Sequence, residues 1–197
     1  KNIIKEIKKY LWNLEKSTIN SGFYYTNTNN IDIFINSKSV LSHEFIHMCT
    51  NNGINCGFHL NTRFNEKIGM GLNEGYTELL NTRIFKYEHY GYHKNVGIVK
   101  LLETFFDNPK DFENAFFHND LDTVILQFCK YGTKEEFFNL LEKLDNFATG
   151  PIPLKDFAQY HKLQFELYEI IKRSNDPIKI QNFENILFQN PLNKILK

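Results

Sequence analysis

Two histidines four residues apart, with a glutamate beside the first, have the clearest capacity for chemistry in this chain. They stand in the segment His43-Glu44-Phe45-Ile46-His47. Positions four apart share a helix face, so the two imidazoles would converge on one point, where neutral ring nitrogens are good ligands for Zn²⁺. Glu44 would hold a metal-bound water and take its proton. The segment predicts a hydrolytic metal site, and the alternative is a pair of hydrogen-bonded core histidines.

A second segment repeats this spacing with glutamates. Glu74 and Glu78 stand in Leu72-Asn73-Glu74-Gly75-Tyr76-Thr77-Glu78. On one helix face, one carboxylate can complete a metal site while the other supports a ligand histidine from behind. Such a pair alone is usually solvated, but downstream of two candidate histidine ligands we interpret it as part of the site. Gly75 would let this helix approach the first one closely.

The two segments resemble those of the gluzincins, the thermolysin-like zinc metallopeptidases. The family pattern is H-E-x-x-H followed on a second helix by N-E-x-x-[ST]-[DE], and it is met here by residues 43–47 and 73–78. The resemblance covers residues 31–92. It implies that one zinc ion is bound by His43, His47 and Glu74, that Glu44 is the general base, and that Glu78 holds a ligand histidine.

The chain departs from the family pattern in two places. The gap between His47 and Glu74 is longer than in thermolysin, and Glu78 stands where Asp is usual. The Gly-x-Met-Glu-Asn segment of the aminopeptidase branch is not found between Asn30 and Ser42. An endopeptidase is therefore favoured over an exopeptidase.

The tetrahedral oxyanion of peptide hydrolysis needs a further donor, usually Tyr or His. We favour Tyr92, which follows the second helix in a segment that Gly91 lets fold back. Other candidates lie beside it: His93, Tyr90 and His89. Tyr76 and Tyr87 would point away from Glu74 on the helix and are expected to pack. Three histidines without a partner motif are expected to be ordinary surface or core residues: His59, His118 and His161.

Several elements must position these residues. Apolar spacing predicts a packing helix over residues 3–14. Alternation predicts a half-buried strand over Ile31–Ile35. The resemblance to the gluzincins implies that it is the edge strand with which an extended peptide pairs. The helix carrying the two histidines would span residues 40–49, capped by Asn36 or Ser37 and apolar on most of its circumference, so it should be buried.

The remainder of the chain predicts further helices. After a glycine-rich loop they cover residues 72–88, 96–106, 111–117, 121–131 and 134–147, and after the turn at 149–153 residues 154–173 and 178–188. Phenylalanines of this half are assigned to the core: Phe105, Phe106, Phe137 and Phe138. We expect one α+β domain over residues 1–197, zincin-like by the resemblance, with a small N-terminal sheet and an active-site helix within residues 1–50 and a mostly helical part over 72–197.

The composition limits the function classes. The 197 residues include 23 Lys and Arg and 23 Asp and Glu, so the formal net charge is zero, which argues against nucleic acid as a partner. Hydrophobic residues make up 42%, enough for a core, and no apolar run is long enough to span a membrane. The abundant Lys, Asn and Ile fit an AT-rich bacterial genome.

Three cysteines bear on the compartment: Cys49, Cys56 and Cys129. Their number does not suggest a disulfide framework, which favours a cytoplasmic over a secreted location. The separation of Cys49 and Cys56 allows a pair without requiring one.

The sequence therefore predicts a zinc-dependent endopeptidase acting on a peptide or protein substrate. One alternative is a catalytically inactive, zinc-stabilised binding or regulatory protein on the same scaffold. Another is a helical interaction module that binds no metal. The sequence does not predict the oligomeric state.

Overall fold

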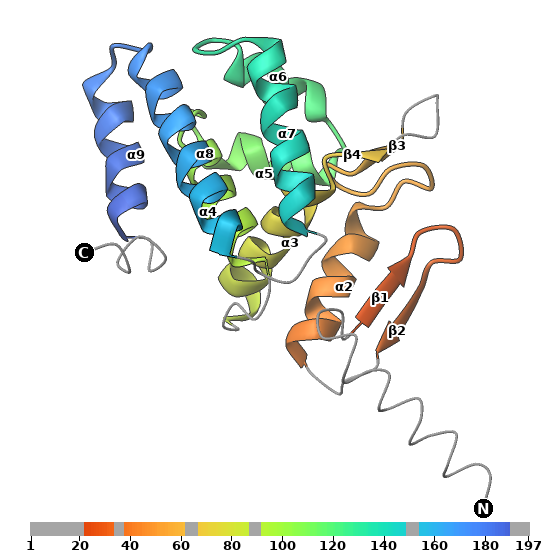
Figure 1. The fold of residues 1–197 in the computed structure, drawn as a ribbon. Helices are drawn as coiled ribbons and strands as arrows, with labels where there is room; N and C mark the ends of the chain where they lie inside the picture. The colour runs from red at the N-terminus through yellow and green to blue at the C-terminus, as the bar shows by residue number, and fades with distance from the viewer. Residues whose placement is uncertain (1–21, 34–37, 62–66, 87–91, 149–153, 190–197) are drawn as a thin grey trace, which may run out of the picture.

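The computed structural model describes residues 22–33, 38–61, 67–86, 92–148 and 154–189 (Figure 1). Within these ranges the chain is mostly helical and carries two two-stranded antiparallel sheets, which confirms the broad α+β class. The helix expected over residues 3–14, the caps Asn36 and Ser37, and the turn at 149–153 lie outside the described residues.

The expected helices from residue 40 onward are present with shifted ends. They are α2 (Lys38–Thr50), α3 (Met70–Phe85), α4 (His93–Glu103), α5 (Pro109–Phe117), α6 (Leu121–Phe128), α7 (Lys134–Ala148), α8 (Leu154–Lys172) and α9 (Pro177–Gln189). The larger shifts are in α4, which begins at His93 rather than Val96, and α6, which ends at Phe128 rather than Tyr131. At the latter end, the Gly132 N–H bonds the Phe128 carbonyl and closes a turn.

A β-hairpin precedes α2. Strand β1 (Gly22–Tyr25) pairs antiparallel with β2 (Asn30–Ile33), and Gly22 lies opposite Ile33. The predicted alternation in β2 is confirmed, since its isoleucines are half-buried and its polar residues exposed. Sequence analysis did not predict β1, nor the short pair β3 (Leu60–Asn61) and β4 (Lys67–Ile68) inside the expected loop. Figure 1 shows the hairpin beside α2, away from α8 and α9.

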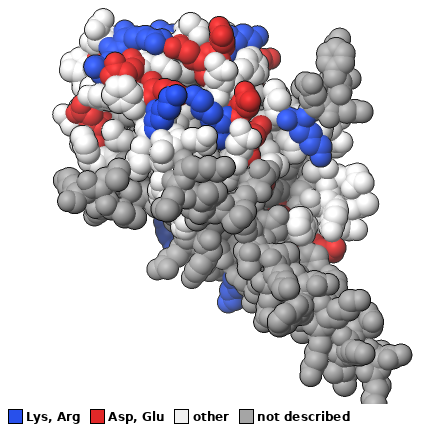
Figure 2. Space-filling view, viewed as in Figure 1, with Lys and Arg blue, Asp and Glu red and all other residues white. Residues whose placement is uncertain are grey.

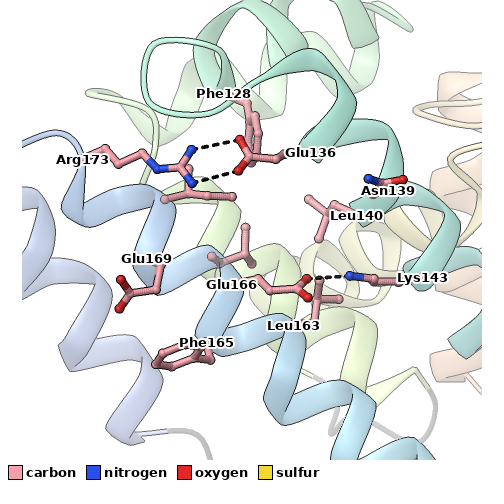
Figure 3. A pocket seen from close by; sticks show the side chains of 12 residues that line it. Phe128, Glu136, Asn139, Leu140, Lys143, Leu163, Phe165, Glu166, Glu169 and Arg173 are labelled. Atoms are coloured by element: carbon pink, nitrogen blue, oxygen red, sulfur yellow. Dashed lines mark hydrogen bonds and ion pairs between the residues drawn. The ribbon is translucent and has the colours of Figure 1, made fainter.

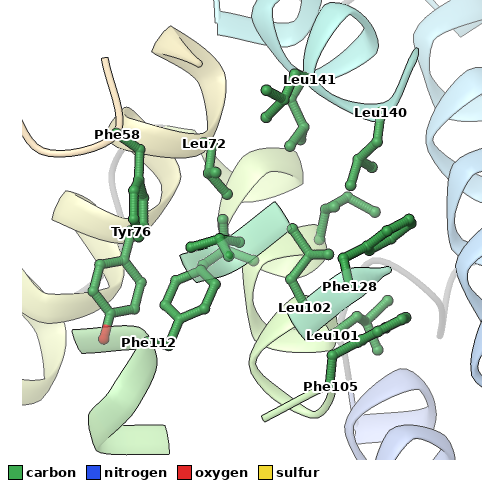
Figure 4. Packing of buried hydrophobic residues seen from close by; sticks show 14 of the residues in the cluster. Phe58, Leu72, Tyr76, Leu101, Leu102, Phe105, Phe112, Phe128, Leu140 and Leu141 are labelled. Carbon is green, nitrogen blue, oxygen red and sulfur yellow. The ribbon is translucent and has the colours of Figure 1, made fainter. Parts of the chain in front are cut away.

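The hydrophobic core lies among the helices that follow α2 (Figure 4). Phe58 and Tyr76 are fully buried and meet the rings of Phe112 and Phe116 in edge contacts with centroids 4.8–5.3 Å apart. The rings of Phe58 and Tyr76 themselves make a tilted contact at 6.0 Å. Such aromatic pairs add to the free energy gained by burying the rings. Of the phenylalanines assigned to this core, Phe138 is an exception: it is 38% exposed because it lies on the outer face of α7.

The start of α3 rests on α7. Gly69 has a left-handed φ of 80° and offers no side-chain cap. The carboxylate of Asp145 on α7 caps this end of the helix instead. It accepts hydrogen bonds from the backbone N–H groups of Gly69 at 3.1 Å and Gly71 at 2.6 Å. A Cβ on Gly71 would lie 2.1 Å from the Leu144 carbonyl oxygen, so only glycine permits this approach. The amide of Asn95 adds a bridge, donating to the carbonyls of Gly71 and Leu144.

Gly75 serves a different contact from the one expected. A Cβ at this position would lie 2.8 Å from the Asn95 carbonyl carbon and 2.9 Å from Val99 Cγ2. Gly75 therefore permits α3 to approach α4, and the expectation that it faces the histidine helix is wrong.

The buried face of α2 is polar, which corrects the expectation of an apolar helix buried by its hydrophobic residues. Leu41 and Phe45 are 50% and 45% exposed. The residues that face inward are mainly polar: Ser39, Ser42, His43, Glu44, Ile46, His47 and Thr50. Their polar groups find hydrogen-bond partners on α3. Asn81 of α3 accepts a hydrogen bond from the Ser42 hydroxyl at 2.5 Å and donates one to the Ser39 carbonyl at 3.0 Å.

Charged side chains of both signs are interspersed on the described part of the face shown in Figure 2. This mixing agrees with the zero formal charge of the chain. Among the described residues, no helix has the length and apolar character needed to cross a bilayer.

Candidate metal centre

Helices α2 and α3 bring three candidate ligands together. Nε2 of His43 lies 3.1 Å from Nε2 of His47 and 3.1 Å from Oε2 of Glu74, and the His47–Glu74 distance is 3.4 Å. In a tetrahedral zinc site with bonds of about 2.0–2.1 Å, ligand atoms lie about 3.3–3.4 Å apart. The three side chains are thus spaced as ligands of one ion, and this group can hold a metal ion.

Glu78 fixes the ring of His43. Its Oε2 lies 2.8 Å from His43 Nδ1, and its side chain is 7% exposed. Nδ1 therefore carries the proton that is donated to Glu78, and the Nε2 lone pair is left facing the other two ligands. Behind His47, Nδ1 lies 3.2 Å from Nδ2 of Asn73 and 3.4 Å from Oγ1 of Thr77.

The charges of these groups are strongly coupled. Burial alone would lower the pKa of His43, but hydrogen bonds to Glu74 and Glu78 outweigh burial and raise it. The pKa of His47 is likewise raised well above its usual value, against burial, by the charge of Glu74 and by hydrogen bonds. Burial alone would raise the pKa of Glu74, but the charge of His47 and the hydrogen bonds to both histidines outweigh burial and lower it. A cation between these side chains would offset the negative charge of Glu74, as a proton on either histidine does.

Glu44 lies beside this group and is held by β1. Its side chain is buried and lines the same pocket as His47 and Glu74. The backbone N–H of Tyr24 donates to its carboxylate, but burial is the larger influence and raises the pKa of Glu44. A Cβ on Gly22 would lie 3.2 Å from Glu44 Cγ, so the glycine lets the strand pass close to this carboxylate.

The strand beside the pocket is β1 and not the predicted one. Gly22, Phe23, Tyr24 and Thr26 line the pocket, whereas β2 contributes no lining residue among the described part of the chain. The described part of the predicted strand, Asn30–Ile33, is β2; it pairs with β1, and β1 is the strand whose residues line the pocket.

Tyr92 reaches the metal group from the start of α4. Its ring stacks on His43 with centroids 5.9 Å apart and 16° between planes. Burial, the charges of Glu74 and Glu44 and a hydrogen bond with Glu74 raise the pKa of the Tyr92 phenol. Its left-handed φ of 53° turns the chain into the helix. The alternative His93 is exposed.

Three of the other tyrosines and histidines considered above do not line this pocket: Tyr76, His118 and His161. Tyr76 is fully buried in the core, which confirms its packing role. Tyr87, His89 and Tyr90 lie outside the described residues. His118 bonds the Asn114 carbonyl of its own helix, and His161 bonds Gln164.

His59 is a site residue that sequence analysis missed. It lines the pocket of about 130 Å³ that also contains His47, Glu74 and Tyr92. No motif surrounds His59, and the pairing of its backbone with Cys56 comes from a turn that the loop sequence does not predict.

The cysteines are free in the structure. Cys56 is buried against α2, and its thiol donates to the His47 carbonyl at 3.2 Å, whereas Cys49 is exposed. The two do not form a disulfide.

A larger hollow of about 310 Å³ lies between α7 and α8 (Figure 3). Its charged rim is paired internally: Arg173 with Glu136 at 2.9 Å and Lys143 with Glu166 at 2.6 Å. Because these charges satisfy each other, the hollow shows no convergent group comparable with the one between α2 and α3.

Comparisons of the chain with protein-family models, with curated proteins and with solved structures find no match. What the geometry itself defines is a mostly helical α+β protein with a buried group of two histidines and one glutamate that can hold a metal ion.

Proposed function

We propose that this protein is a zinc-dependent peptidase, with a zincin-like scaffold and endopeptidase action. The observation that carries the proposal is the convergence of Nε2 of His43, Nε2 of His47 and Oε2 of Glu74 within 3.4 Å of one another. The two-histidine, one-glutamate set is that of catalytic zinc sites, which leave a fourth position open.

A proton is the alternative occupant of this space. With Nδ1 of His43 donating to Glu78, Nε2 of His43 is an acceptor that faces a second carboxylate and a second imidazole. A single proton can satisfy two of these three atoms, whereas a divalent ion can satisfy all three. Two nitrogens and one oxygen as donors, without a thiolate, suit zinc among the borderline cations.

Zinc held there would polarise a carbonyl and lower the pKa of a water towards 7. Glu44, on the same helix and lining the same pocket, would accept the proton of that water and return it to the leaving amine. Its raised pKa makes it a better base than a free carboxylate. Glu78 and Thr77 would hold the ligand rings in orientation.

The position of the Tyr92 phenol supports a role for this residue in stabilising the transition state. It lies between His43, on which it stacks, and Glu74, to which it hydrogen-bonds. With a substrate present it would donate to the oxygen of the scissile carbonyl as negative charge develops there. The substrate itself would lie along β1, whose residues form one wall of the pocket.

The test combines metal analysis with one matched pair of variants. Elemental analysis should find one zinc per chain in the wild type, and a mixed-peptide library should show cleavage. Glu44→Gln should keep the zinc and lose about 10²–10⁴-fold in turnover, while Glu142→Gln, an exposed position on α7, should match the wild type.

The outcomes separate the three classes of protein. Zinc with cleavage that depends on Glu44 supports the peptidase. Zinc with no cleavage of any library member favours the inactive binding or regulatory protein. A chain that binds no zinc at micromolar concentration would overturn the metal site altogether.

A further inference from the structure

Asn51 joins the end of α2 to the β-hairpin that forms one wall of the metal pocket. It follows the last residue of α2 and stands four residues after His47. Its side-chain amide donates two hydrogen bonds to the hairpin, one to the Tyr24 hydroxyl and one to the Thr26 carbonyl at 3.0 Å. Tyr24 and Thr26 both line the pocket, so this one side chain connects the pocket wall to the helix that carries both histidines.

Asn51 is itself held in place. Its Oδ1 accepts the Gly53 N–H at 2.9 Å, and its backbone forms an antiparallel bridge with Cys56. Because the amide oxygen is engaged in this turn, the amide nitrogen is the group that faces the hairpin. The Tyr24 hydroxyl donates to Asn29 at 2.8 Å, so its oxygen is free to accept the bond from Asn51.

Apart from α2, the described part of the chain gives the hairpin (residues 22–33) little support. None of its described residues belongs to the hydrophobic core cluster, and among the described strands β1 and β2 pair only with each other. The hairpin packs on α2, where a Cβ on Gly22 would lie 2.6 Å from Val40. A two-stranded hairpin is by itself only marginally stable in water, so the bonds from Asn51 contribute to fixing its position.

In this position β1 presents its backbone to the pocket. The Tyr24 N–H points to Glu44, to whose carboxylate it donates. The edge of β1 opposite β2 has no strand partner among the described residues, and such an edge is where an extended peptide can add as a further strand. If the hairpin moved, the apparent affinity for a peptide would fall in proportion to the fraction of molecules in which β1 is in place.

We propose that Asn51 is a positioning residue of the substrate site, which holds β1 where it can bind an extended peptide beside the metal group. This inference rests on the proposed peptidase function. It follows from the two hydrogen bonds that one fixed amide makes to residues of the pocket wall and from the sparse packing of the hairpin elsewhere. Asn51 does not itself line the pocket, so it acts through Tyr24 and Thr26.

The test compares Asn51→Ala with Asn52→Ala, a matched change in the same turn. Asn52 accepts the N–H groups of Ile54 and Asn55 with its side chain, so its replacement disturbs the turn without removing the two bonds to the hairpin. Three probes are used: the best peptide from the library, a phosphinic analogue of that peptide, and acetohydroxamic acid, a zinc ligand too small to pair with β1.

Asn51→Ala should retain its zinc and raise KM roughly 10- to 100-fold, because two hydrogen bonds are lost. It should change kcat far less, since a bound peptide itself holds the strand in place. The phosphinic peptide should bind weaker by a similar factor, and acetohydroxamic acid as tightly as to the wild type. Tyr24→Phe removes one of the two bonds and should raise KM about 3- to 10-fold, with little further effect when combined with Asn51→Ala. Asn52→Ala should behave as wild type.

Each contrary result has a separate meaning. If zinc-loaded Asn51→Ala binds the phosphinic peptide as tightly as the wild type, the positioning role is wrong and the peptidase function stands. If Asn51→Ala loses its zinc, or if acetohydroxamic acid weakens as much as the phosphinic peptide, the residue supports the metal centre as a whole and the positioning role is likewise wrong. An equal loss in Asn52→Ala would assign the effect to the turn and also overturn the proposal. If the zinc-loaded wild type neither cleaves the library nor binds phosphinic peptides, the proposed function fails, and this inference with it.

Discussion

Glu78 decides which nitrogen of His43 is left for a metal. The 2.8 Å contact with Nδ1 fixes the ring and its tautomer, and the low exposure of the carboxylate keeps water from replacing it. A carboxylate in this position also makes the ligand nitrogen more basic. Glu78 therefore acts on the metal through His43 without contacting it.

Replacing Glu78 tests this indirect action. We expect Glu78→Ala to weaken zinc affinity about 10- to 100-fold, because the ring of His43 loses its acceptor. Competition with a chromophoric chelator measures the change. Glu142→Ala, at an exposed position, serves as the control, and equal zinc affinity in the two variants would show that Glu78 is not part of the site.

Each pair of residues in the metal group could be predicted from helical periodicity, and the resemblance to the gluzincins implied that the two pairs meet. Two pairs with a separation of four residues each define a face, and the structure places both faces against each other. His59 could not be predicted in this way. Its place depends on a backbone turn at Gly57 and on the anchoring of Phe58 to Asn73, and no local pattern encodes either contact.

At the scale of elements, the contact between α2 and α3 is polar over its length. Beyond the metal group, it continues to the hydrogen bonds of Asn81 with Ser39 and Ser42. A polar interface of this kind is stable only when each buried group has its partner. It fixes the relative position of the two helices more narrowly than apolar packing, which tolerates small shifts.

Removing one polar side chain from this interface should therefore lower the stability of the protein. We expect Asn81→Ala to lower the free energy of unfolding by about 1–3 kcal/mol, because Ser42 and the Ser39 carbonyl lose their buried partner. Denaturant unfolding measures the change. Asn139→Ala, exposed on α7, should change stability by less than about 0.5 kcal/mol, and a loss no larger at Asn81 would contradict the role given to this interface.

The same interface explains why the orientation of α2 was misjudged. Leu41 and Phe45 look like the buried face in the sequence, but the partner offered by α3 is a row of polar side chains, so the serines and histidines turn inward. Helix existence depends on local spacing and was predictable, whereas the choice of buried face depends on the partner. The short strands β1, β3 and β4 were missed for a similar reason, since pairing across a turn stabilises them.

At the scale of the whole molecule, metal binding and protonation compete for one buried site. In the metal-free protein the raised pKa values of His43 and His47 mean that their protonated forms contribute stability below the unfolded pKa of about 6.5. This contribution is lost as pH rises through the folded values. Zinc needs both Nε2 atoms unprotonated, so its stabilisation has the opposite pH dependence.

Calorimetry of zinc-loaded and chelator-treated protein should show this opposition. At a free zinc concentration a hundred times the dissociation constant measured at pH 7, we expect about 2.7 kcal/mol of stabilisation at that pH, or about 5–10 °C in Tm. With this zinc concentration held constant, the difference between the two forms should grow from about pH 6 to about pH 8, because zinc binds more tightly as the histidines lose their protons. His43→Ala should show little or no difference, and a gain in the wild type that is constant or falls with rising pH would contradict the coupling.

The hydrogen bonds that join the start of α3 to α7 have a consequence for biosynthesis. The Gly71–Asp145 hydrogen bond joins residues 74 positions apart, so the segment with every proposed ligand leaves the ribosome long before its support does. We expect the nascent polypeptide to capture zinc only after translation of α7. Ribosome-bound chains stalled with residue 133 as the last one exposed should retain no ion, and stable retention by such chains would show that the first half assembles its centre unaided.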